Sequence, residues 1–394
     1  MPPLLILALV VFVLLYATAQ LGLAWKLQRV PADVAVPPPG SAEAPSTASS
    51  HLAFRPSSLV PQPLPLVAVL VAARNEEANL RRCLTALAAL DYPPDRLTVL
   101  IADDNSTDAT AHLLADFVRD RPTWRVLTIT ERLGAAKGKA NALAHLIAVT
   151  DVELLLCCDA DIAVPPTWAR ALVAEAQHTN AALVVGTTLI EGASTLARAQ
   201  CLDWLRALAV LRVATAAGRP FTGMGNNQLL RRSAYYATGG YETLPFSVTE
   251  DFQLFQELTR LGFRTAHVFG PGALAWSAPV ESWSTLVRQR RRWLRGLLAG
   301  LTPRLAAAAT VEALVFPALL ALVFGGAVGW GLGAWGAKIL ATAGLLRVAR
   351  RRLSLPSIGA LEILRYEGYV VLLALVLPVA AMWPGKVRWK GREL

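Results

Sequence analysis

The sequence contains few of the side chains that bind zinc. Its 394 residues include only four cysteines and five histidines. The cysteines do not have metal-binding spacing, and Cys157 and Cys158 lie inside an apolar, strand-like run. We interpret them as buried, reduced thiols of a cytosolic domain. The histidines are scattered along the chain, so the sequence argues against a zinc site.

Charge is also scarce, and it is absent from long stretches near the chain ends. Charged residues make up 17% of the chain and hydrophobic residues 54%. Pro3 to Trp25 has no charged residue, and a helix of this length can cross a hydrocarbon core of about 30 Å. A cleaved signal peptide would have a basic start, whereas here the first cations, Lys26 and Arg29, follow the apolar run. We therefore predict an uncleaved anchor with the following segment inside the cell.

Two more uncharged runs, Ala313–Ala337 and Gly368–Gly385, lie near the C-terminus. If residues 309–346 form a two-pass hairpin, Arg350–Arg352 return to the inside. A full last pass would place the basic residues 386–392 outside, against the positive-inside bias. We therefore favour an in-plane or re-entrant last segment, which keeps both C-terminal basic clusters inside.

The net charge of +10 could indicate a nucleic-acid partner. The basic residues, however, cluster beside the apolar runs, at Arg288–Arg295, Arg347–Arg352 and Lys386–Arg392. This placement is typical of the positive-inside bias and of contact with anionic membrane lipids. We predict membrane lipids, and no nucleic acid, as partners.

Composition divides the chain into six parts. Between the apolar ends, residues 62–305 have the composition of a soluble domain, and a Pro-, Ala- and Ser-rich stretch precedes them. We predict an N-terminal transmembrane anchor, a linker, an α/β domain, an amphipathic interfacial helix, a C-terminal transmembrane region of two or three segments and a basic tail, at residues 1–25, 26–61, 62–280, 281–305, 306–385 and 386–394.

Strands and helices alternate in the middle of the chain. Helices are expected up to Leu90, over 110–120 and over 139–149. Alternation of this kind predicts βαβ units and a mostly parallel, doubly covered sheet, in which ligands bind beyond the carboxyl ends of the strands. The expected strands are Leu66–Ala73, Leu97–Ala102, Arg125–Thr130, Leu154–Cys158 and Ala182–Val185. Those that are apolar throughout fit burial on both faces of the sheet.

Acidic pairs follow two of these strands. Asp103 and Asp104 follow the second strand, where Ser106 or Asp108 could instead cap the next helix. Asp159 and Asp161 follow the fourth strand. Two carboxylates one residue apart can bind a hard divalent cation together with substrate phosphates. Since both pairs end parallel strands, we expect them to meet at one edge of the sheet.

Two further motifs lie downstream. Thr249-Glu250-Asp251 precedes an apolar helical run, and a simple helix-capping sequence is the alternative interpretation. Residues 289–293 (QRRRW) lie in an amphipathic stretch typical of a membrane surface. There the arginines could serve only as anchors to lipid head groups. Alternatively, Arg292 contacts a diphosphate and Trp293 stacks on a sugar.

Five short motifs occur in one order in a chain with apolar ends: VAARNEE, DDNSTD, DAD, TED and QRRRW. Residues 64–300 thereby resemble the processive-type family 2 glycosyltransferases, which include cellulose, hyaluronan and poly-N-acetylglucosamine synthases and ceramide glucosyltransferase-like enzymes. The terminal RWKGR is similar to that of bacterial members. The resemblance implies a GT-A fold, an inverting mechanism, a UDP-sugar donor and a location in the bacterial inner membrane with the catalytic domain in the cytoplasm.

The resemblance also implies roles for single residues. Asp251 would be the general base, and Asp161, with Asp159, would bind Mg²⁺ or Mn²⁺ at the donor site. Residues 221–227 (FTGMGNN) resemble an acceptor-side loop of the family. The remaining residues would bind the donor or the acceptor end: Ala72, Arg74 and Glu76 around the nucleoside, Asp103 and Asp104 near base and ribose, Lys139 at the phosphates, and Gln289, Arg292 and Trp293 at the diphosphate and acceptor.

These roles agree with the chemistry of sugar transfer, in which a cation neutralises the leaving diphosphate and a carboxylate activates the acceptor hydroxyl. The acceptor is left open between a lipid and a growing glycan, and the short apolar region favours a lipid or a short oligosaccharide. Two other classes are alternatives: a nucleotidyltransferase with a similar sheet, and a non-catalytic membrane partner of a polysaccharide synthase.

Overall fold

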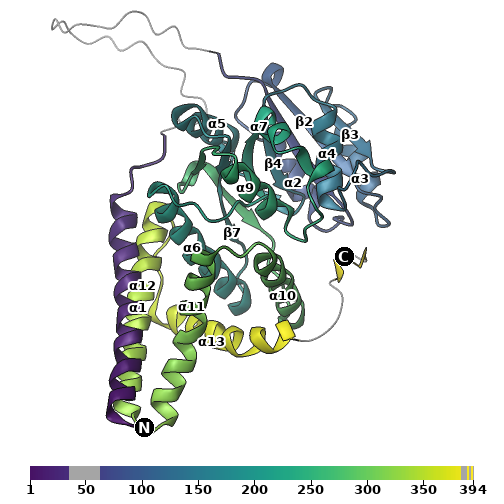
Figure 1. Ribbon diagram of the computed structural model, residues 1–394. Helices are drawn as coiled ribbons and strands as arrows, with labels where there is room; N and C mark the ends of the chain where they lie inside the picture. The colour runs from purple at the N-terminus through teal and green to yellow at the C-terminus, as the bar shows by residue number, and fades with distance from the viewer. Residues whose placement is uncertain (35–62, 383–387, 390–391, 394) are drawn as a thin grey trace, which may run out of the picture.

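The computed structural model describes residues 1–34, 63–382, 388–389 and 392–393. An α/β domain stands on a group of long apolar helices (Figure 1). Most of the expected linker lies outside the described residues, as does part of the expected basic tail. The described tail residues form two short paired strands, β11 (Arg388–Trp389) and β12 (Arg392–Glu393).

Four parallel strands form one half of the main sheet in the order β3-β2-β1-β4. They are β1 (Val67–Ala73), β2 (Leu97–Asp103), β3 (Trp124–Thr128) and β4 (Leu154–Asp159). The crossovers are α2 (Leu80–Ala88), η1 (Pro94–Arg96), α3 (Thr110–Val118) and α4 (Lys139–Ala148). Ala72 is in register with Ala102 and with Asp159, so the strands end at one edge. The predicted βαβ series is confirmed.

The other half of the sheet is mixed. The expected strand at 182–185 forms as β6 (Leu183–Val185), but β8 (Asn227–Arg231) inserts between it and β4 and runs antiparallel to both. The strand β9 (Thr265–His267) completes the sheet beside β6. A smaller sheet has the order β5-β10-β7, with β5 (Ile162–Ala163), β10 (Leu274–Ser277) and β7 (Thr187–Ile190).

Helices cover this second half and connect its strands. The longest, α6, follows β7 directly, and its N-cap Ser194 accepts a hydrogen bond from the backbone N–H of Ala197 at 3.1 Å. The elements are α5 (Trp168–Thr179), α6 (Thr195–Ala216), α7 (Arg232–Ala237), α8 (Gly240–Thr243), α9 (Glu250–Arg260), η2 (Pro271–Ala273) and α10 (Trp283–Ala299).

The core lies on both faces of the sheet. Successive residues of β1 alternate between the two apolar clusters: Ala68 and Leu70 pack on one face, and Val67, Val69 and Val71 on the other. Burial of each Val or Leu side chain stabilises the fold by about 1.5–3 kcal/mol. The strand β1 is therefore apolar along its whole length, and polar residues begin only where it ends.

Four described helices are long and apolar enough to cross a membrane: α1 (Pro3–Arg29), α11 (Pro303–Phe324), α12 (Val328–Arg352) and α13 (Ala360–Met382). The helices α1 and α12 run side by side in the same direction. The Met1 amino group donates to Gly325 O at 3.2 Å at one end, and Arg352 donates to Leu27 O at 2.8 Å at the other. In contrast, α13 runs crosswise and packs on α6 and α10 (Figure 1).

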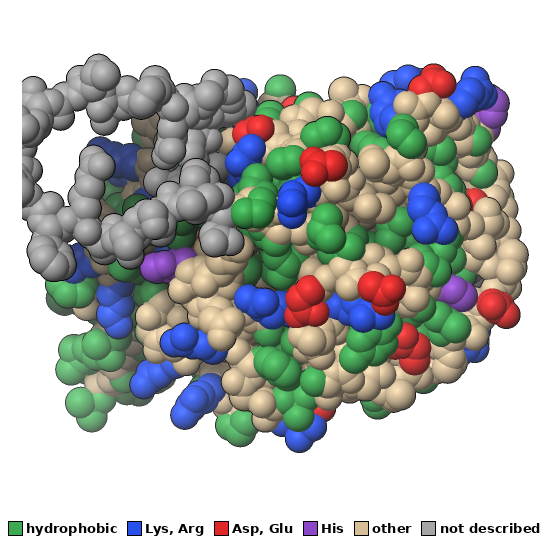
Figure 2. Space-filling view, turned by 90° about the horizontal axis from the view of Figure 1, so that it is seen from above, with side chains coloured by type: hydrophobic (Ala, Val, Ile, Leu, Met, Phe, Trp, Pro, Cys, Tyr) green, Lys and Arg blue, Asp and Glu red, His purple; other side chains and the backbone are tan. Residues whose placement is uncertain are grey.

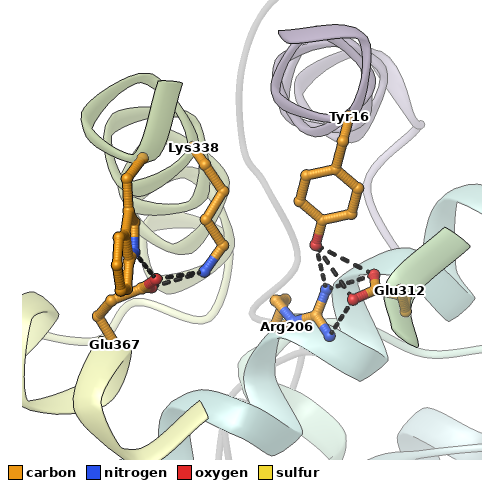
Figure 3. A network of polar contacts seen from close by, with 6 residues as sticks. Tyr16, Arg206, Glu312, Lys338 and Glu367 are labelled. Atoms are coloured by element: carbon orange, nitrogen blue, oxygen red, sulfur yellow. Dashed lines mark hydrogen bonds and ion pairs between the residues drawn. The ribbon is translucent and has the colours of Figure 1, made fainter. Parts of the chain in front are cut away.

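Two charge clusters lie among the apolar helices (Figure 3). The first joins α6, α11 and α1: Arg206 is 2.9 Å from Glu312, and the Tyr16 hydroxyl donates to Glu312 at 3.1 Å. The second joins α12 to α13 through Lys338 and Glu367, 2.6 Å apart and almost fully buried. Charges are costly among apolar helices and are kept there in pairs. These pairs fix the apolar helices to one another and to α6 of the α/β domain.

The chain segment after α1 is bound by two arginines. Arg212 of α6 lies 2.9 Å from Asp33 and donates to Pro31 O at 3.0 Å. Arg352, at the end of α12, donates to Val30 O at 2.6 Å and to Pro31 O at 2.8 Å. We name residues 30–33 with Arg212 and Arg352 the junction clasp, because it fastens the end of α1 to both parts of the molecule.

The face of the molecule seen from above, turned away from the apolar helices, carries acidic and basic side chains interspersed with one another (Figure 2). This mixture is typical of a surface that faces water. The two ends of the molecule therefore differ in polarity, as the composition of the chain predicts.

Candidate active site

One cavity of about 1150 Å³ opens at the carboxyl edge of β1 and β4 and continues beside α6 and α10. It brings together side chains that the sequence places more than two hundred residues apart. The cavity is lined by every predicted site residue except Asp103: Ala72, Arg74, Glu76, Asp104, Lys139, Asp159, Asp161, Asp251, Gln289, Arg292 and Trp293.

The turn after β1 is held against the turn after β2. Arg74 donates to the carbonyl groups of Asp104 and Asn105, the latter at 3.0 Å, and the backbone N–H of Glu76 donates to Thr110 Oγ1 at 2.7 Å. Asp103 is buried, and its carboxylate accepts from the backbone N–H of Ser106 at 3.2 Å. Asp104 therefore reaches the cavity, while Asp103 shapes the turn behind it.

Asp159 and Asp161 flank the sharp turn between β4 and β5. Lys139, at the start of α4, places its Nζ 2.5 Å from Asp159 Oδ1. Ser277 Oγ donates to Asp161 Oδ2 at 3.4 Å, and Arg82 donates to Asp161 O at 3.3 Å. Side chains from α2, α4 and β10 therefore hold this acidic turn in place.

The two acids fit a divalent cation that also binds the substrate. Among the described residues, no group of three or more His, Cys, Asp or Glu could hold a metal by itself. Mg²⁺ and similar hard ions commonly use only one or two carboxylates and complete their shell with substrate phosphates and water. Asp159 and Asp161 supply such a pair on the wall of a cavity large enough for a nucleotide.

The third acidic motif begins α9. The Thr249 side chain does not cap this helix, so the simple capping interpretation is wrong for Thr249. Asp251 Oδ2 instead accepts from the backbone N–H of Gly225 at 2.8 Å. A Cβ at position 225 would come within 2.8 Å of the Asp251 Cβ. Glycine at this position therefore allows the 221–227 loop to approach the carboxylate.

Lys139 is the electrostatic centre of the cavity. Its Nζ is 3.3 Å from Glu250 in addition to its contact with Asp159. Burial lowers the pKa of Lys139, but the carboxylates of Asp159, Glu250 and Asp251 outweigh burial and raise that pKa above its usual range. Burial raises the pKa of Glu250, and nearby Asp251 adds to this effect while Lys139 opposes it. The cavity thus holds a fixed ammonium group among three carboxyl groups.

The QRRRW motif occupies the middle of α10. Arg292 donates to Val248 O at 3.0 Å, and the ring of Trp293 packs edge-on to Trp204 of α6 with ring centroids 5.7 Å apart. Arg290 pairs with Asp203 at 2.8 Å and stacks over Trp293, 4.6 Å from the ring centroid. The motif therefore faces the cavity, and α13 lies behind it.

The residues that line the cavity but were missing from the predicted site include the charged residues Asp203, Glu250 and Arg290. Glu250 lies in the Thr249-Glu250-Asp251 motif and Arg290 in QRRRW, but neither residue was assigned a role from the sequence. Asp203 lies in α6, where no motif marked it. Its partner Arg290 is 87 positions away in the sequence, so only the folded chain shows the pair.

Most residues of the 221–227 loop line the cavity, and its last residue lies in the core. Phe221, Thr222, Gly223, Met224 and Asn226 line the cavity. The last loop residue, however, is fully buried: the Asn227 side chain accepts from Trp168 Nε1 at 2.8 Å and donates to two backbone carbonyl groups. Asn227 therefore fixes the base of the loop within the core.

The architecture is that of the GT-A class of fold. A parallel βαβ series joins a mixed half-sheet, and an acidic turn lies at the edge of the cavity. The solved structure of the mannosyltransferase PcManGT from Pyrobaculum calidifontis, in complex with GDP-Man and Mn²⁺, is similar with a TM-score of 0.55 and 18% identity. The similarity covers 95% of this chain and 99% of that one. It shows the fold.

The chain belongs to the glycosyltransferase like family 2, whose model matches residues 63–296. It is 31% identical over 241 residues to the probable glycosyltransferase YdaM of Bacillus subtilis, with 59% of this chain and 55% of that protein covered. It is also 31% identical over 241 residues to the beta-monoglucosyldiacylglycerol synthase of Synechocystis sp., with 59% of this chain and 48% of that protein covered. The matched part spans about half the length of these curated relatives.

Proposed function

We propose that this protein is an inverting glycosyltransferase. It moves a sugar from a nucleotide diphosphate, with UDP the first candidate, onto a hydroxyl group of a lipid or a growing glycan. The observation that carries the proposal is the single cavity that joins Asp159, Asp161, Lys139 and Asp251. This set combines the groups needed at a leaving diphosphate with a carboxylate for the acceptor.

The donor diphosphate lies against Asp159 and Asp161 in this proposal, with its nucleoside toward Ala72, Arg74 and Asp104. A divalent cation bound by the two acids, Mg²⁺ or Mn²⁺, would neutralise negative charge on the leaving group. Lys139 is close enough to Asp159 to exchange that contact for a phosphate oxygen. The positive charge of Lys139 would stabilise the negative charge that develops on the leaving diphosphate.

Asp251 accepts the proton of the acceptor hydroxyl as that oxygen attacks the anomeric carbon of the sugar. The C–O bond to the diphosphate breaks in the same displacement, and the configuration at the anomeric carbon inverts. The backbone N–H of Gly225 holds one carboxylate oxygen of Asp251. The backbone N–H of Phe252 holds the other oxygen at 2.8 Å. Both oxygens are thereby fixed at the cavity, and each keeps further lone pairs for the proton of the acceptor hydroxyl.

The apolar helices support a location at a membrane. We place the α/β domain at the cytoplasmic face of a bacterial inner membrane, with Arg350–Arg352 on the same side. The crosswise course of α13 beneath α6 and α10 supports an in-plane last segment (Figure 1).

The test is a donor screen on the detergent-solubilised full chain with Mg²⁺ or Mn²⁺, in which nucleoside diphosphate release and the anomeric configuration of the product are measured. We expect release with one nucleotide sugar and an inverted product. Release of inorganic diphosphate would instead favour a nucleotidyltransferase. If Asp251→Asn leaves the cellular glycan unchanged while deletion of the chain abolishes it, a non-catalytic partner role is favoured.

A further inference from the structure

The active-site cavity has a second, apolar section that the donor does not need. Asp159, Glu250 and Lys139 form a charged cluster at the donor end, whereas aliphatic side chains from α6, α10, α11 and the 221–227 loop line another part of the cavity. We name this part the apolar section and define it by Leu208, Leu211, Met224, Leu294, Leu297 and Leu305.

The apolar section begins directly beside the proposed base. Gly296 of α10 packs so closely on Thr249, two residues before Asp251, that a Cβ there would be 2.4 Å from Thr249 Oγ1. Gln256 of α9 donates to Gly300 O at 2.6 Å and fixes the end of α10 to the same helix. A molecule that presents a hydroxyl group to Asp251 would therefore extend past Leu297.

The far end of this section reaches the apolar helices. Leu305 lines the cavity and lies in the first turn of α11, one of the helices long enough to cross a membrane. Hydrocarbon chains could therefore pass from the cavity into the bilayer without crossing water, which would favour their binding. A glycan chain would need hydrogen-bonding partners along this path, and its defining side chains offer none.

Charge restricts the acceptor further. Eight carboxyl groups and five Lys or Arg side chains line the cavity, a formal excess of three negative charges. A nucleotide diphosphate and one divalent cation would leave this excess nearly unchanged. In addition, Arg290 is already paired with Asp203. A phosphate on the acceptor would add negative charge where the cavity has a surplus of it.

We infer that the acceptor is an uncharged lipid, with a free hydroxyl group at Asp251 and its hydrocarbon chains in the apolar section. The inference rests on the proposed function and specifies its acceptor. Neither a lipid phosphate nor a growing polysaccharide fits the apolar lining and the negative charge together.

The experiment compares acceptors on the full chain in phosphatidylcholine nanodiscs, with the donor and cation found by the screen. The probes are 1,2-dioleoylglycerol, undecaprenyl phosphate and a chitin pentasaccharide. We expect dioleoylglycerol to accelerate nucleoside diphosphate release about tenfold or more and to yield a lipid with one added sugar. Faster release with undecaprenyl phosphate or with the pentasaccharide would overturn the inference but leave the proposed function intact.

A pair of adjacent variants tests the apolar section itself. Leu297→Trp fills the section, so we expect the KM for dioleoylglycerol to rise about tenfold or more, and the KM for the short-chain dioctanoylglycerol to rise less. Leu298→Trp is the control, because Leu298 is 54% exposed on another side of α10. Equal effects of both variants, or equal effects on both chain lengths, would contradict the placement of the hydrocarbon chains.

Discussion

Asp251 is the residue on which the proposed chemistry depends most directly. We predict that Asp251→Asn lowers kcat by about 10²–10⁴ with little change in the KM of the donor, because the amide cannot take the acceptor proton. Steady-state release of nucleoside diphosphate measures this. Glu257→Gln, on the outer side of the same helix where Glu257 pairs with Arg260, should keep full activity. A comparable loss in both variants would indicate damage to α9 rather than to the base.

Gly225 offers a second test at a single residue. Its backbone N–H, and not a side chain, holds the carboxylate of Asp251. The Cβ of Gly225→Ala would come within 2.8 Å of the Asp251 Cβ, so the loop or the carboxylate must move. We predict a loss of kcat of about tenfold or more, since displacements of about 1 Å cost this much or more in active sites. Wild-type kcat in a variant of unchanged thermal stability would show that the Gly225–Asp251 contact is not needed.

His267 makes the stability of the domain depend on pH. It is fully buried, and burial, with Arg212 nearby, lowers its pKa to about 3. In the unfolded chain its pKa is about 6.5, so acid protonates the unfolded chain first. The stabilisation is therefore complete above pH 6.5 and is lost as the pH falls toward 3.

Because acid protonates His267 in the unfolded chain first, acid favours unfolding. We predict that the wild type loses about 2 kcal/mol of stability through His267 between pH 7 and pH 5. His267→Gln should lack this component. Unfolding of both proteins at the two pH values, monitored by tryptophan fluorescence, measures the difference. Parallel losses in the two proteins would mean that His267 binds its proton as readily in the folded chain as in the unfolded chain.

At the scale of elements, the polar contact of α12 with α13 is centred on Glu367, which pairs with Lys338 and accepts from Trp335 Nε1 at 2.6 Å. Lys338 and Glu367 are 3% and 6% exposed. Removal of one partner leaves a buried charge alone and typically costs about 3–5 kcal/mol, whereas an apolar replacement of both is often tolerated. We predict that Glu367→Leu destabilises the protein strongly and that Lys338→Met/Glu367→Leu recovers most of the loss. Thermal unfolding in detergent tests this, and a double variant no better than Glu367→Leu would contradict it.

The sequence predicted the elements whose signals are local. The strands β1, β2 and β4 are mainly apolar runs that end at polar residues, Arg74 after β1 and acids at the ends of β2 and β4, so their positions and their shared edge could be predicted directly. The strand β8 could not be found in this way. Its place between β4 and β6 is fixed by pairing with Leu154–Cys158 and Leu183–Val185, and such distant pairing leaves no mark on the short segment itself.

The same distinction applies to the site. Motif residues such as Asp159 and Asp251 were predicted because each follows or begins a recognisable element. The sequence could not separate Asp103 from Asp104. Both are buried, and only the turn geometry places Asp104 on the wall of the cavity and Asp103 behind it. The Asp203–Arg290 pair required knowledge of how α6 packs on α10.

At the scale of the whole molecule, the cavity is expected to be complete only with a divalent cation. We predict that EDTA reduces nucleoside diphosphate release to background and that Mn²⁺ or Mg²⁺ restores it, because two carboxylates alone cannot neutralise the leaving group. Asp161→Asn should raise the cation concentration needed for half-maximal activity. The control is Asp116→Asn, on the outer surface of α3, which should respond to the cation as the wild type does. Full activity in EDTA would exclude a metal role for this pair.

The junction clasp has a consequence for how this protein can be divided. Arg212 stands inside the α/β domain, yet its carboxylate partner Asp33 belongs to the chain that leaves α1. A shortened chain that starts at residue 62 would leave this guanidinium group without its counter-charge and uncover the side of α6 that meets the apolar helices. Excision of the α/β domain for crystallisation or assay should therefore give an insoluble fragment, whereas a version that keeps α1 and residues 30–33 retains the counter-charge of Arg212.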